Sequence, residues 1–411
     1  MPTRPFATKV IQKLVDAGFI AYFAGGWVRD YLMKHPSDDI DIATSASVDE
    51  IRALFPKTIP VGVAFGIVIV VQDGHHFEVA TFRKDRGYVD GRRPSGIDPA
   101  TPEEDAERRD FTINGMFFDP LTNTLYDYVG GQRDIEKKLI RAIGDPHARF
   151  SEDRLRMMRA VRYCTRFDFT IDPDTLQAIK AHAESLLPAV AMERIWQEFK
   201  KMSQFAHFDR GLLILHRLHL LQTIFPALKN VPIEEIEARL CFIAHFPKKA
   251  PAIAELLELF PNSSLEELLQ LCEYLKLSRE DREFVTTLHH ARHLLSLPEG
   301  WRKDLEPIEW AQFYANRYAE ICLEIAVARA PVKQKESMLL EHRQRKDLLH
   351  DAVRRIQTKQ PIVRSDDLLK EGITPGVKMG KLLIEAERLS VNQNIVNKEE
   401  ILQQLKRSAL W

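Results

Sequence analysis

The stretch FAGGWVRD (residues 23–30), followed by SDDIDIAT (residues 37–44), decides how the chain begins to fold. Two glycines separate a short apolar run from a helical run, a pattern typical of a strand, a tight turn and a helix. Asp38, Asp39 and Asp41 then lie directly before Ile42 and Ala43, which are typical of a buried strand. Like charges placed close together where the chain enters a core repel one another, so the stretch indicates a binding site for a positively charged group.

The three aspartates have different expected directions. Side chains alternate along a strand, so we expect Asp39 and Asp41 on one face and Asp38 on the other, as a solvated or capping acid. Paired carboxylates suit Mg²⁺, which takes one or two of them and leaves positions for substrate phosphates. Glu78, on a neighbouring predicted strand, is a candidate third carboxylate, and an exposed acid on an edge strand is an equally good interpretation of it.

The glycine pair indicates an anion site beside these acids. Gly25 and Gly26 would expose backbone N–H groups at the start of a helix, with Arg29 in its first turn, an arrangement that suits a triphosphate. Each feature alone is common, because glycine pairs occur in ordinary turns and aspartate pairs on exposed strands. Their occurrence together, in this order, favours a nucleotide site next to a metal site.

The composition is that of a globular protein with two or three domains. The 411 residues are 45% hydrophobic and 28% charged, and the net charge of −1 means that a polyanion would be held by local patches. The four cysteines show no CxxC spacing, so neither a zinc site nor a disulfide framework is expected, and a reducing cytoplasm fits best. No apolar signal core and no membrane span are expected.

The order of helical and strand patterns predicts an α+β fold, with a small mixed-sheet head followed by a helical remainder. Asp73-Gly74 is a hairpin signal, and residues 84–107 are polar and rich in glycine and proline, which predicts a mobile loop. From about Ser151 a helical period runs to the C-terminus. The head is predicted to contain helices at 7–17, 28–33 and 48–54, strands at 20–24, 66–74 and 75–83, and a further strand that begins within 37–44.

A stripe of acid and arginine begins the helical region. Asp153, Arg156, Arg159 and Arg162, here named the acid–arginine stripe, recur at three-residue steps and would share one side of a helix. In the simplest interpretation the stripe is an exposed ladder of ion pairs, each contributing about 0.3 kcal/mol.

Five long motifs resemble one family. GGWVRDYL and SDDIDIATSA are followed by RRDFTINGMFFDP (108–120), GGQRDIEKKLIRAIGDPHARFSEDRLRMMRAVRY (130–163) and AMERIWQEF (191–199). Their order and spacing resemble those of class II tRNA nucleotidyltransferases and bacterial poly(A) polymerases, within the DNA polymerase β-like superfamily. The resemblance is good from about residue 20 to residue 200. It implies a catalytic head (1–145), a base-selecting neck (146–203), a body (204–330) and a tRNA-binding tail (331–411).

The resemblance also implies roles for single residues. Asp39 and Asp41 would bind two catalytic Mg²⁺ ions, with Glu78 as the further candidate, and Arg109 would be catalytic. Asp110 would shape the site. The implied nucleotide-binding residues are Gly25, Gly26, Arg29, Arg109, Asn114, Asp153, Arg156, Arg159 and Arg162.

The resemblance implies a second interpretation of the acid–arginine stripe, in which its side chains select the incoming base in place of a template strand. A carboxylate only accepts and a guanidinium only donates, so Asp153 and Arg156 can pair with the edge of cytosine or of adenine. Uracil and guanine present a carbonyl where the amino group should be. Each such mismatch would cost about 1–3 kcal/mol when buried.

Among activities of the family, the sequence favours CCA addition to the tRNA 3′ end from CTP and ATP. Residues 60–70 lack the arginine pair usual in poly(A) polymerases, and DGRRP (90–94) resembles a loop element that CC-adding enzymes lack. A-only addition, poly(A) tailing and a non-catalytic RNA-binding relative stay as alternatives. A basic run (Arg343, Arg345, Lys346, Arg354 and Arg355) is either a tRNA phosphate track or a solvated helix. No membrane and no obligate protein partner are expected.

Overall fold

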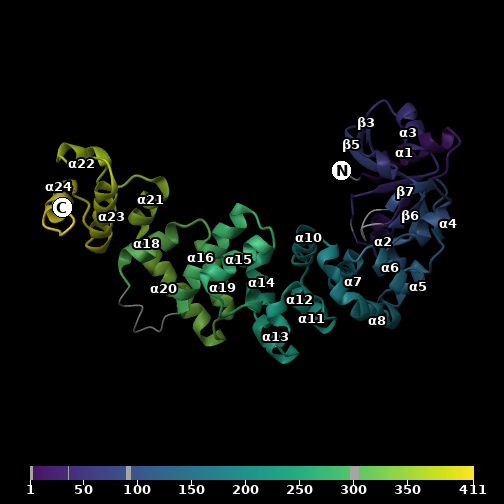
Figure 1. Ribbon diagram of the computed structural model, residues 1–411. Coiled ribbons are helices and arrows are strands. Elements are labelled where there is room, and N and C mark those ends of the chain that lie inside the picture. The colour runs from purple at the N-terminus through teal and green to yellow at the C-terminus, as the bar shows by residue number, and fades with distance from the viewer. Residues whose placement is uncertain (1–2, 36, 89–93, 297–304) are drawn as a thin grey trace. The chain divides into compact units, whose positions relative to one another are not determined.

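Figure 1 shows the chain as a computed structural model. The structure describes residues 3–35, 37–88, 94–296 and 305–411. The chain divides into two compact units, Met1–Ala238 and Arg239–Trp411. The first unit contains a sheet, whereas each regular element described in the second is a helix, so the predicted α+β class is confirmed.

A seven-stranded mixed sheet forms the centre of the first unit. Its order is β3-β4-β5-β2-β1-β8-β9, and β2 and β5 run parallel while the other neighbours run antiparallel. The strands are β1 (Ala21–Ala24), β2 (Asp41–Thr44), β3 (Thr58–Gly62), β4 (Ile67–Gln72), β5 (His75–Thr81), β8 (Met116–Asp119) and β9 (Thr124–Asp127).

Alternate residues of the central strands enter two clusters, one on each face of the sheet. Phe23, Ile42 and Val79 point into the main core, which α1 (Arg4–Asp16) and α3 (Val48–Leu54) cover. On the opposite face the corresponding positions of β1 and β2 are Ala24 and Ala43. Because alanine fills little space, this second face leaves room for a site beside the central strands.

The hairpin and the third helix form as predicted. Asp73 and Gly74 both have positive φ, 51° and 81°, as a tight turn between twisted strands requires. Helix α3 has the predicted bounds, Val48–Leu54. Helix α2 (Gly26–Leu32) begins two residues earlier than predicted, at the second glycine, so Arg29 is its fourth residue and not part of a first turn starting at Val28.

The prediction of a loop over residues 84–107 was wrong for the described residues. Strands β6 (Arg83–Tyr88) and β7 (Pro94–Pro99) pair as an antiparallel ribbon, and α4 (Pro102–Glu107) follows with a capping box between Thr101 and Glu104. A two-stranded ribbon has no face in a core, so its sequence lacks the alternation that reveals a strand. Residues 89–93, most of DGRRP, lie outside the described residues.

Helices dominate the chain after the sheet. One short parallel pair, β10 (Leu139–Ile140) and β11 (Thr170–Ile171), interrupts the helical region that was predicted from Ser151. Helix α7 packs against α10 and α11. The helices are α5 (Gly131–Glu136), α6 (Pro146–Glu152), α7 (Leu155–Phe167), α8 (Pro173–His182), α9 (Leu186–Ala189), α10 (Met192–Met202), α11 (Phe208–Arg217), α12 (Leu220–Ile224) and α13 (Ile233–Leu240).

The second unit contains two groups of helices. The last three helices, from α22 to α24, enclose a core of their own around Leu368, Leu382 and Ile401. Among the described residues of the chain, helices are all too short or too polar to cross a bilayer. The unit contains α14 (Ala252–Leu256), α15 (Leu265–Tyr274), α16 (Arg279–Ser296), α18 (Pro307–Ala315), α19 (Ala319–Arg329), α20 (Val332–Leu348), α21 (His350–Thr358), α22 (Ser365–Lys370), α23 (Val377–Asn392) and α24 (Lys398–Lys406).

Candidate active site

Strand register brings the motifs of the head to one edge of the sheet. Ala24, the last residue of β1, pairs with Asp41, the first residue of β2. The glycines that follow β1 and the acids that precede β2 therefore meet. In the parallel pair of β2 and β5, Ile42 lies opposite Val79, so Asp41 lies beside Glu78.

Asp41 is the carboxylate at the centre of this edge. Burial, followed by the neighbouring charges of Glu78 and Asp39, raises its pKa to about 7, while Arg109 acts in the opposite direction. A carboxyl group with this environment is stabilised as an anion by any added positive charge. A cation added beside Asp41 would therefore lower the pKa of this carboxyl group.

The other two aspartates precede β2, which begins at Asp41. Ile40 and Ile42 both enter the main core, and the facing of the Asp38 and Asp39 side chains stays a prediction. Asp38 and Asp39 are both exposed and lie outside any strand, directly before β2. The Thr3 hydroxyl donates to the Asp38 carbonyl at 2.9 Å, so Asp38 helps to hold the N-terminal segment. Asp39 acts on Asp41 through its charge.

All the predicted nucleotide-binding residues line one cavity of about 430 Å³. Asp41 also lines it, while Asp39 and Glu78 do not. Asp41 and Glu78 share a smaller neighbouring cavity of about 180 Å³. The larger cavity is lined by Gly25, Gly26, Arg29, Asp41, Arg108, Arg109, Asp110, Asn114, Asp153, Arg156, Arg159, Arg162, Tyr163 and Arg166.

Gly25 permits a close approach that other residues would prevent. Its φ of 62° and ψ of −123° suit glycine, and a Cβ atom there would lie 2.9 Å from Nη1 of Arg109. Its N–H donates to the Met116 carbonyl at 3.3 Å, so the expectation that this N–H faces an anion was wrong. Gly25 serves the site by making room for Arg109.

Seven arginines line the cavity, and each is held by a carboxylate. These anchoring acids lie on several elements and hold the arginines in place. The lining itself contains seven arginines and three aspartates, so positive charge predominates in the cavity. The pairs are Arg29 and Arg166 with Asp30, Arg108 and Arg109 with Asp105, Arg156 with Glu152, Arg159 with Asp110, and Arg162 with Glu198. Such a surface suits a polyanion.

The acid–arginine stripe is not the exposed ladder of the simplest interpretation. Asp153 lies outside a helix, at the break between α6 and α7, with φ −141° and ψ 103°. Its Oδ1 accepts the Leu155 N–H at 3.0 Å, and its Oδ2 accepts from Arg194 at 3.4 Å. Arg156 and Arg162 are each only 8% exposed, so their side chains are set by packing and by partners on other elements.

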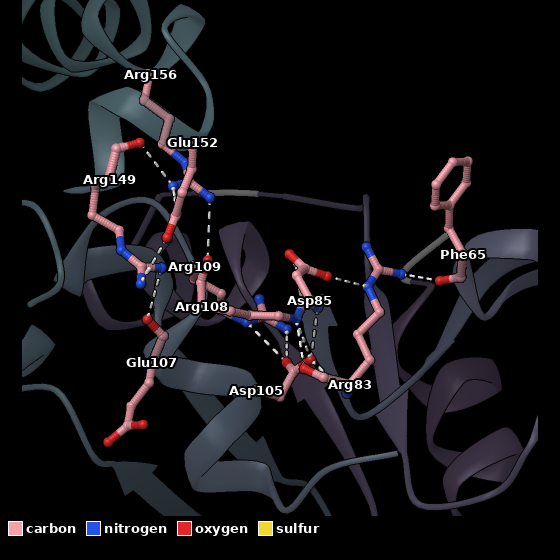
Figure 2. Close-up of polar contacts among 10 residues, drawn as sticks. All are labelled: Phe65, Arg83, Asp85, Asp105, Glu107, Arg108, Arg109, Arg149, Glu152 and Arg156. Carbon is pink, nitrogen blue, oxygen red and sulfur yellow. Dashed lines mark hydrogen bonds and ion pairs between the residues drawn. The ribbon is translucent and has the colours of Figure 1, made fainter. Parts of the chain in front are cut away.

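Contacts of Arg156 and Arg149 join α6 and α7 to the end of α4 (Figure 2). Arg156 donates to the carbonyls of Arg149 at 3.0 Å and Arg108 at 3.3 Å, and to Glu152 at 2.6 Å. Arg149 donates to the Glu107 carbonyl at 3.2 Å. These contacts hold the helix that carries the stripe against the part of the chain that carries Arg109.

Sequence reasoning missed Arg108, Arg166 and Tyr163 in the lining, and it missed the anchoring acids. Arg166 could have been found, because it continues the helical spacing of the stripe on α7. Arg108 could have been found as the first arginine of RRDFT. The acids Asp30, Asp105 and Glu198 gave no signal of their own, because a buried partner is known only once the elements are packed.

Two family models match the chain. Residues 21–141 match the poly A polymerase head domain, and residues 168–231 match the probable RNA and SrmB-binding site of polymerase A. A CCA-adding enzyme of Lactobacillus helveticus is 32% identical over 412 residues, which is 97% of this chain and 95% of that protein. A CCA-adding enzyme of Pediococcus pentosaceus is 47% identical over 207 residues, so the match spans 52% of its length and 50% of this chain.

A solved structure resembles the whole fold. The Bacillus stearothermophilus CCA-adding enzyme in complex with CTP has a TM-score of 0.79 and 30% identity, covering 99% of this chain and 98% of that one. The sheet, the cavity at its edge and these matches define the class as nucleotidyltransferases with a poly A polymerase head. Within that class, the chain belongs to the CCA-adding enzyme family.

Proposed function

We propose that this protein adds CMP, CMP and AMP in turn to the 3′ end of tRNA, using CTP and ATP without a template and releasing pyrophosphate. The observation that carries the proposal is that Asp41, Arg109 and the acid–arginine stripe line one cavity at the sheet edge. The kinship with CCA-adding enzymes supports it.

The arginines would bind the triphosphate. Arg109 approaches Gly25 closely, and Arg29 donates to the Asn114 side chain at 2.5 Å, so both guanidinium groups have fixed positions in the cavity. A guanidinium group has five N–H donors in a planar fork that matches phosphate oxygens. Positions fixed before the substrate arrives reduce the entropy lost on binding, and they orient the α-phosphate for in-line attack.

Asp39, Asp41 and Glu78 would hold divalent cations at the sheet edge. In the described part of the chain no three His, Cys, Asp or Glu side chains form a closed metal-binding group. The fit therefore rests on donor chemistry. Burial, and then the charges of Glu78 and Asp39, raise the pKa of Asp41, and these carboxylate oxygens lie beside a cavity where phosphates would complete the coordination. Two bound Mg²⁺ ions would supply activation of the 3′-hydroxyl and neutralisation of the charge on the pyrophosphate.

Asp153 and Arg156 would select the base. The Asp153 carboxylate accepts two hydrogen bonds within the protein, and a carboxylate has about four acceptor positions, so it can also accept from the amino group of cytosine or adenine. Arg156 is held by two backbone carbonyls and Glu152, which fixes the distance between the acceptor and the donor. Arg159 and Arg162 would support this pair or reach the triphosphate.

The rest of the chain would hold the RNA. We place the tRNA-binding surface in the tail at 331–411, after a body at 204–330, with a neck at 146–203 that joins them to the head at 1–145. All four cysteines are free thiols, in keeping with action in the cytoplasm.

Three tRNA substrates test the proposal and separate its alternatives. The purified protein is incubated with tRNA that ends before CCA, after C or after CC, with each nucleotide triphosphate singly and then with CTP and ATP together. Full CCA addition predicts growth by C on the first two substrates and by one A on the third. Growth only on the CC-ending substrate would show A-only addition, a long ladder with ATP would show tailing, and no growth on any substrate would contradict an enzymatic function.

A further inference from the structure

Asp105, on the last turn of α4, is the most heavily used carboxylate in the described network around the cavity (Figure 2). Its side chain is 1% exposed. Oδ1 accepts from the Arg83 N–H at 3.2 Å and from Nε and Nη2 of Arg108 at 2.9 and 2.6 Å. Oδ2 accepts from Nε and Nη2 of Arg109 at 3.2 and 2.9 Å. Five donors thus converge on one buried acid.

The hydrogen bonds to Oδ2 determine where Arg109 can lie. Its Nη1 donates to the Asn114 carbonyl at 3.3 Å, and its guanidinium carbon lies 4.9 Å from the centre of the Phe117 ring. With the two bonds to Asp105, the described groups take up three of its five N–H donors. Two donors remain for a ligand in the cavity. Without Asp105 the guanidinium group of Arg109 would still stack on the Phe117 ring, but it would lose the two hydrogen bonds that set its direction.

The hydrogen bonds to Oδ1 hold the base of the β6–β7 ribbon. Arg83 is the first residue of β6, and its N–H donates to Asp105 while its carbonyl accepts from Nε of Arg108 at 2.9 Å. The side chain of Arg83 also donates to the Phe65 carbonyl (Figure 2). Asp105 therefore binds the N–H of Arg83 and Arg108 binds its carbonyl, which fixes the backbone of the ribbon at this residue.

We propose that Asp105 is a positioning residue that fixes Arg109 for nucleotide binding and, through the same carboxylate, couples Arg109 to the β6–β7 ribbon. The proposal rests on the proposed function, because it makes Arg109 a ligand of the nucleotide. A displacement of Arg83 shifts the carboxylate whose other oxygen, Oδ2, holds Arg109, and a nucleotide bound to Arg109 restrains Arg83. The ribbon and the nucleotide cavity then affect each other's order.

Asp105→Asn tests the proposal, because it removes the charge and keeps the shape. Glu107→Gln is the matched control on the same helix: its side chain is exposed, and only its carbonyl joins the network. Loss of a charge-assisted hydrogen bond predicts that Asp105→Asn raises KM for CTP and for ATP by about tenfold, with kcat changed less than about twofold. Glu107→Gln should keep both values. An unchanged KM in Asp105→Asn, with a lower Tm only, would overturn the proposal.

Hydrogen exchange on the unmodified protein tests the coupling even where the variant does not fold. CTP with Mg²⁺ should slow exchange of the Arg83 amide, while amides of α3, on the other face of the sheet, stay unchanged. Equal exchange at Arg83 with and without CTP, at a concentration where dialysis shows CTP to be bound, would refute the coupling. CTP that binds without nucleotide addition to any tRNA would instead contradict the proposed function.

Discussion

Asp110 and Arg159 join the head to α7 by a two-pronged ion pair. Nε and Nη2 of Arg159 donate to the same oxygen, Oδ2 of Asp110, at 2.8 and 2.5 Å. The other oxygen accepts from the Asn114 side chain at 3.0 Å. The carboxylate of Asp110, in RRDFT, thus binds both Asn114 and a member of the acid–arginine stripe, so it links the two motifs across the cavity.

The pH dependence of stability should record this pair. Burial would raise the pKa of Asp110, but Arg159 and Asn114 lower it to about 2. A folded pKa below the unfolded value, which is about 3.9, means that this contribution is complete above about pH 4 and is lost as the pH falls through about 2. In urea unfolding at neutral pH, Asp110→Asn should lower the free energy of unfolding by about 2 kcal/mol.

The difference between the wild type and Asp110→Asn should then shrink as the pH falls from 4 to 2. Asp168→Asn is the control, because it removes an ion pair with Arg210 in which both side chains are more than half exposed. It should change stability by less than about 0.5 kcal/mol at any pH. A similar decrease in the free energy of unfolding in both variants would show that the Asp110–Arg159 pair stabilises the fold no more than the exposed Asp168–Arg210 pair does.

Asp41 and Asp38 offer a test within one motif. Asp41→Ala should abolish nucleotide incorporation and leave tRNA binding within about twofold, because under the proposed function Asp41 supplies an oxygen that binds the cation and that the RNA does not need for docking. Asp38→Ala should keep activity, because that side chain is exposed and is not among the residues that line the cavity. Incorporation on a CC-ending tRNA and a filter-binding assay measure the two quantities. Near-normal turnover by Asp41→Ala would refute the metal assignment.

Base choice should depend on the carboxylate of Asp153. Asp153→Asn replaces an acceptor with an NH₂ donor, which can pair with the O4 carbonyl of uracil, so UTP should enter where the wild type excludes it. The change should narrow the preference for CTP over UTP by about tenfold or more. Glu193→Gln, an exposed acid beside Arg194 on α10, is the matched control and should preserve the wild-type preference. Unchanged selectivity in Asp153→Asn would show that another group reads the base.

Two double variants should distinguish basic residues of α20 and α21 that bind RNA from those that stabilise the fold. Arg343 and Lys346 are exposed and line a cavity of about 430 Å³, whereas Arg345 stacks on Trp310 and Arg355 pairs with Glu387. The double variant Arg343→Ala and Lys346→Ala should reduce the salt dependence of tRNA binding, the slope of log K against log salt, by about 1.5. The matched pair Arg345→Ala and Arg355→Ala should instead lower Tm. Equal slopes for wild type and first double variant would argue against a phosphate track there.

Thiol labelling should report the packing of the helices. Burial raises the pKa of Cys164 and Cys272 to about 11 and that of Cys322 to about 12, while Cys241 is exposed. Iodoacetamide at pH 8 should therefore modify Cys241 alone in the native protein, because alkylation requires an accessible thiolate. Mass spectrometry of digests measures this, with urea-unfolded protein as the control in which all four react. Labelling of the other three in native protein would contradict the packing.

The head could be predicted from the sequence where local patterns are strong. The hairpin at Asp73-Gly74, α3 and the strands on either side of the glycine pair follow from turn residues and alternation. The β6–β7 ribbon could not be found in this way, because its polar residues pair with one another and not with a core. For a related reason the motif does not show at which residue the pairing of a strand begins, which for β2 is Asp41.

The candidate site also contains residues that the sequence could predict and residues that it could not. The residues that would touch substrate lie in motifs, so the resemblance brought Arg109, Asp153 and Arg156 together before the fold was known. Their anchors could not be predicted, because Asp105, Asp30 and Glu198 act on residues that only tertiary packing brings within reach. Gly25 was expected to offer an N–H group, but the pairing of β1 with β8 takes that donor and leaves the glycine a steric role.

Sequencing of tRNA 3′ ends after reaction with all four nucleotide triphosphates at equal concentration tests the central claim most directly. The claim is that one cavity at the edge of the sheet chooses bases without a template and adds a limited number of them. Starting from tRNA that ends before CCA, the account predicts ends that read CCA and grow no further. Ends that contain U or G at the level of C and A, or that carry a long run of A, would contradict it.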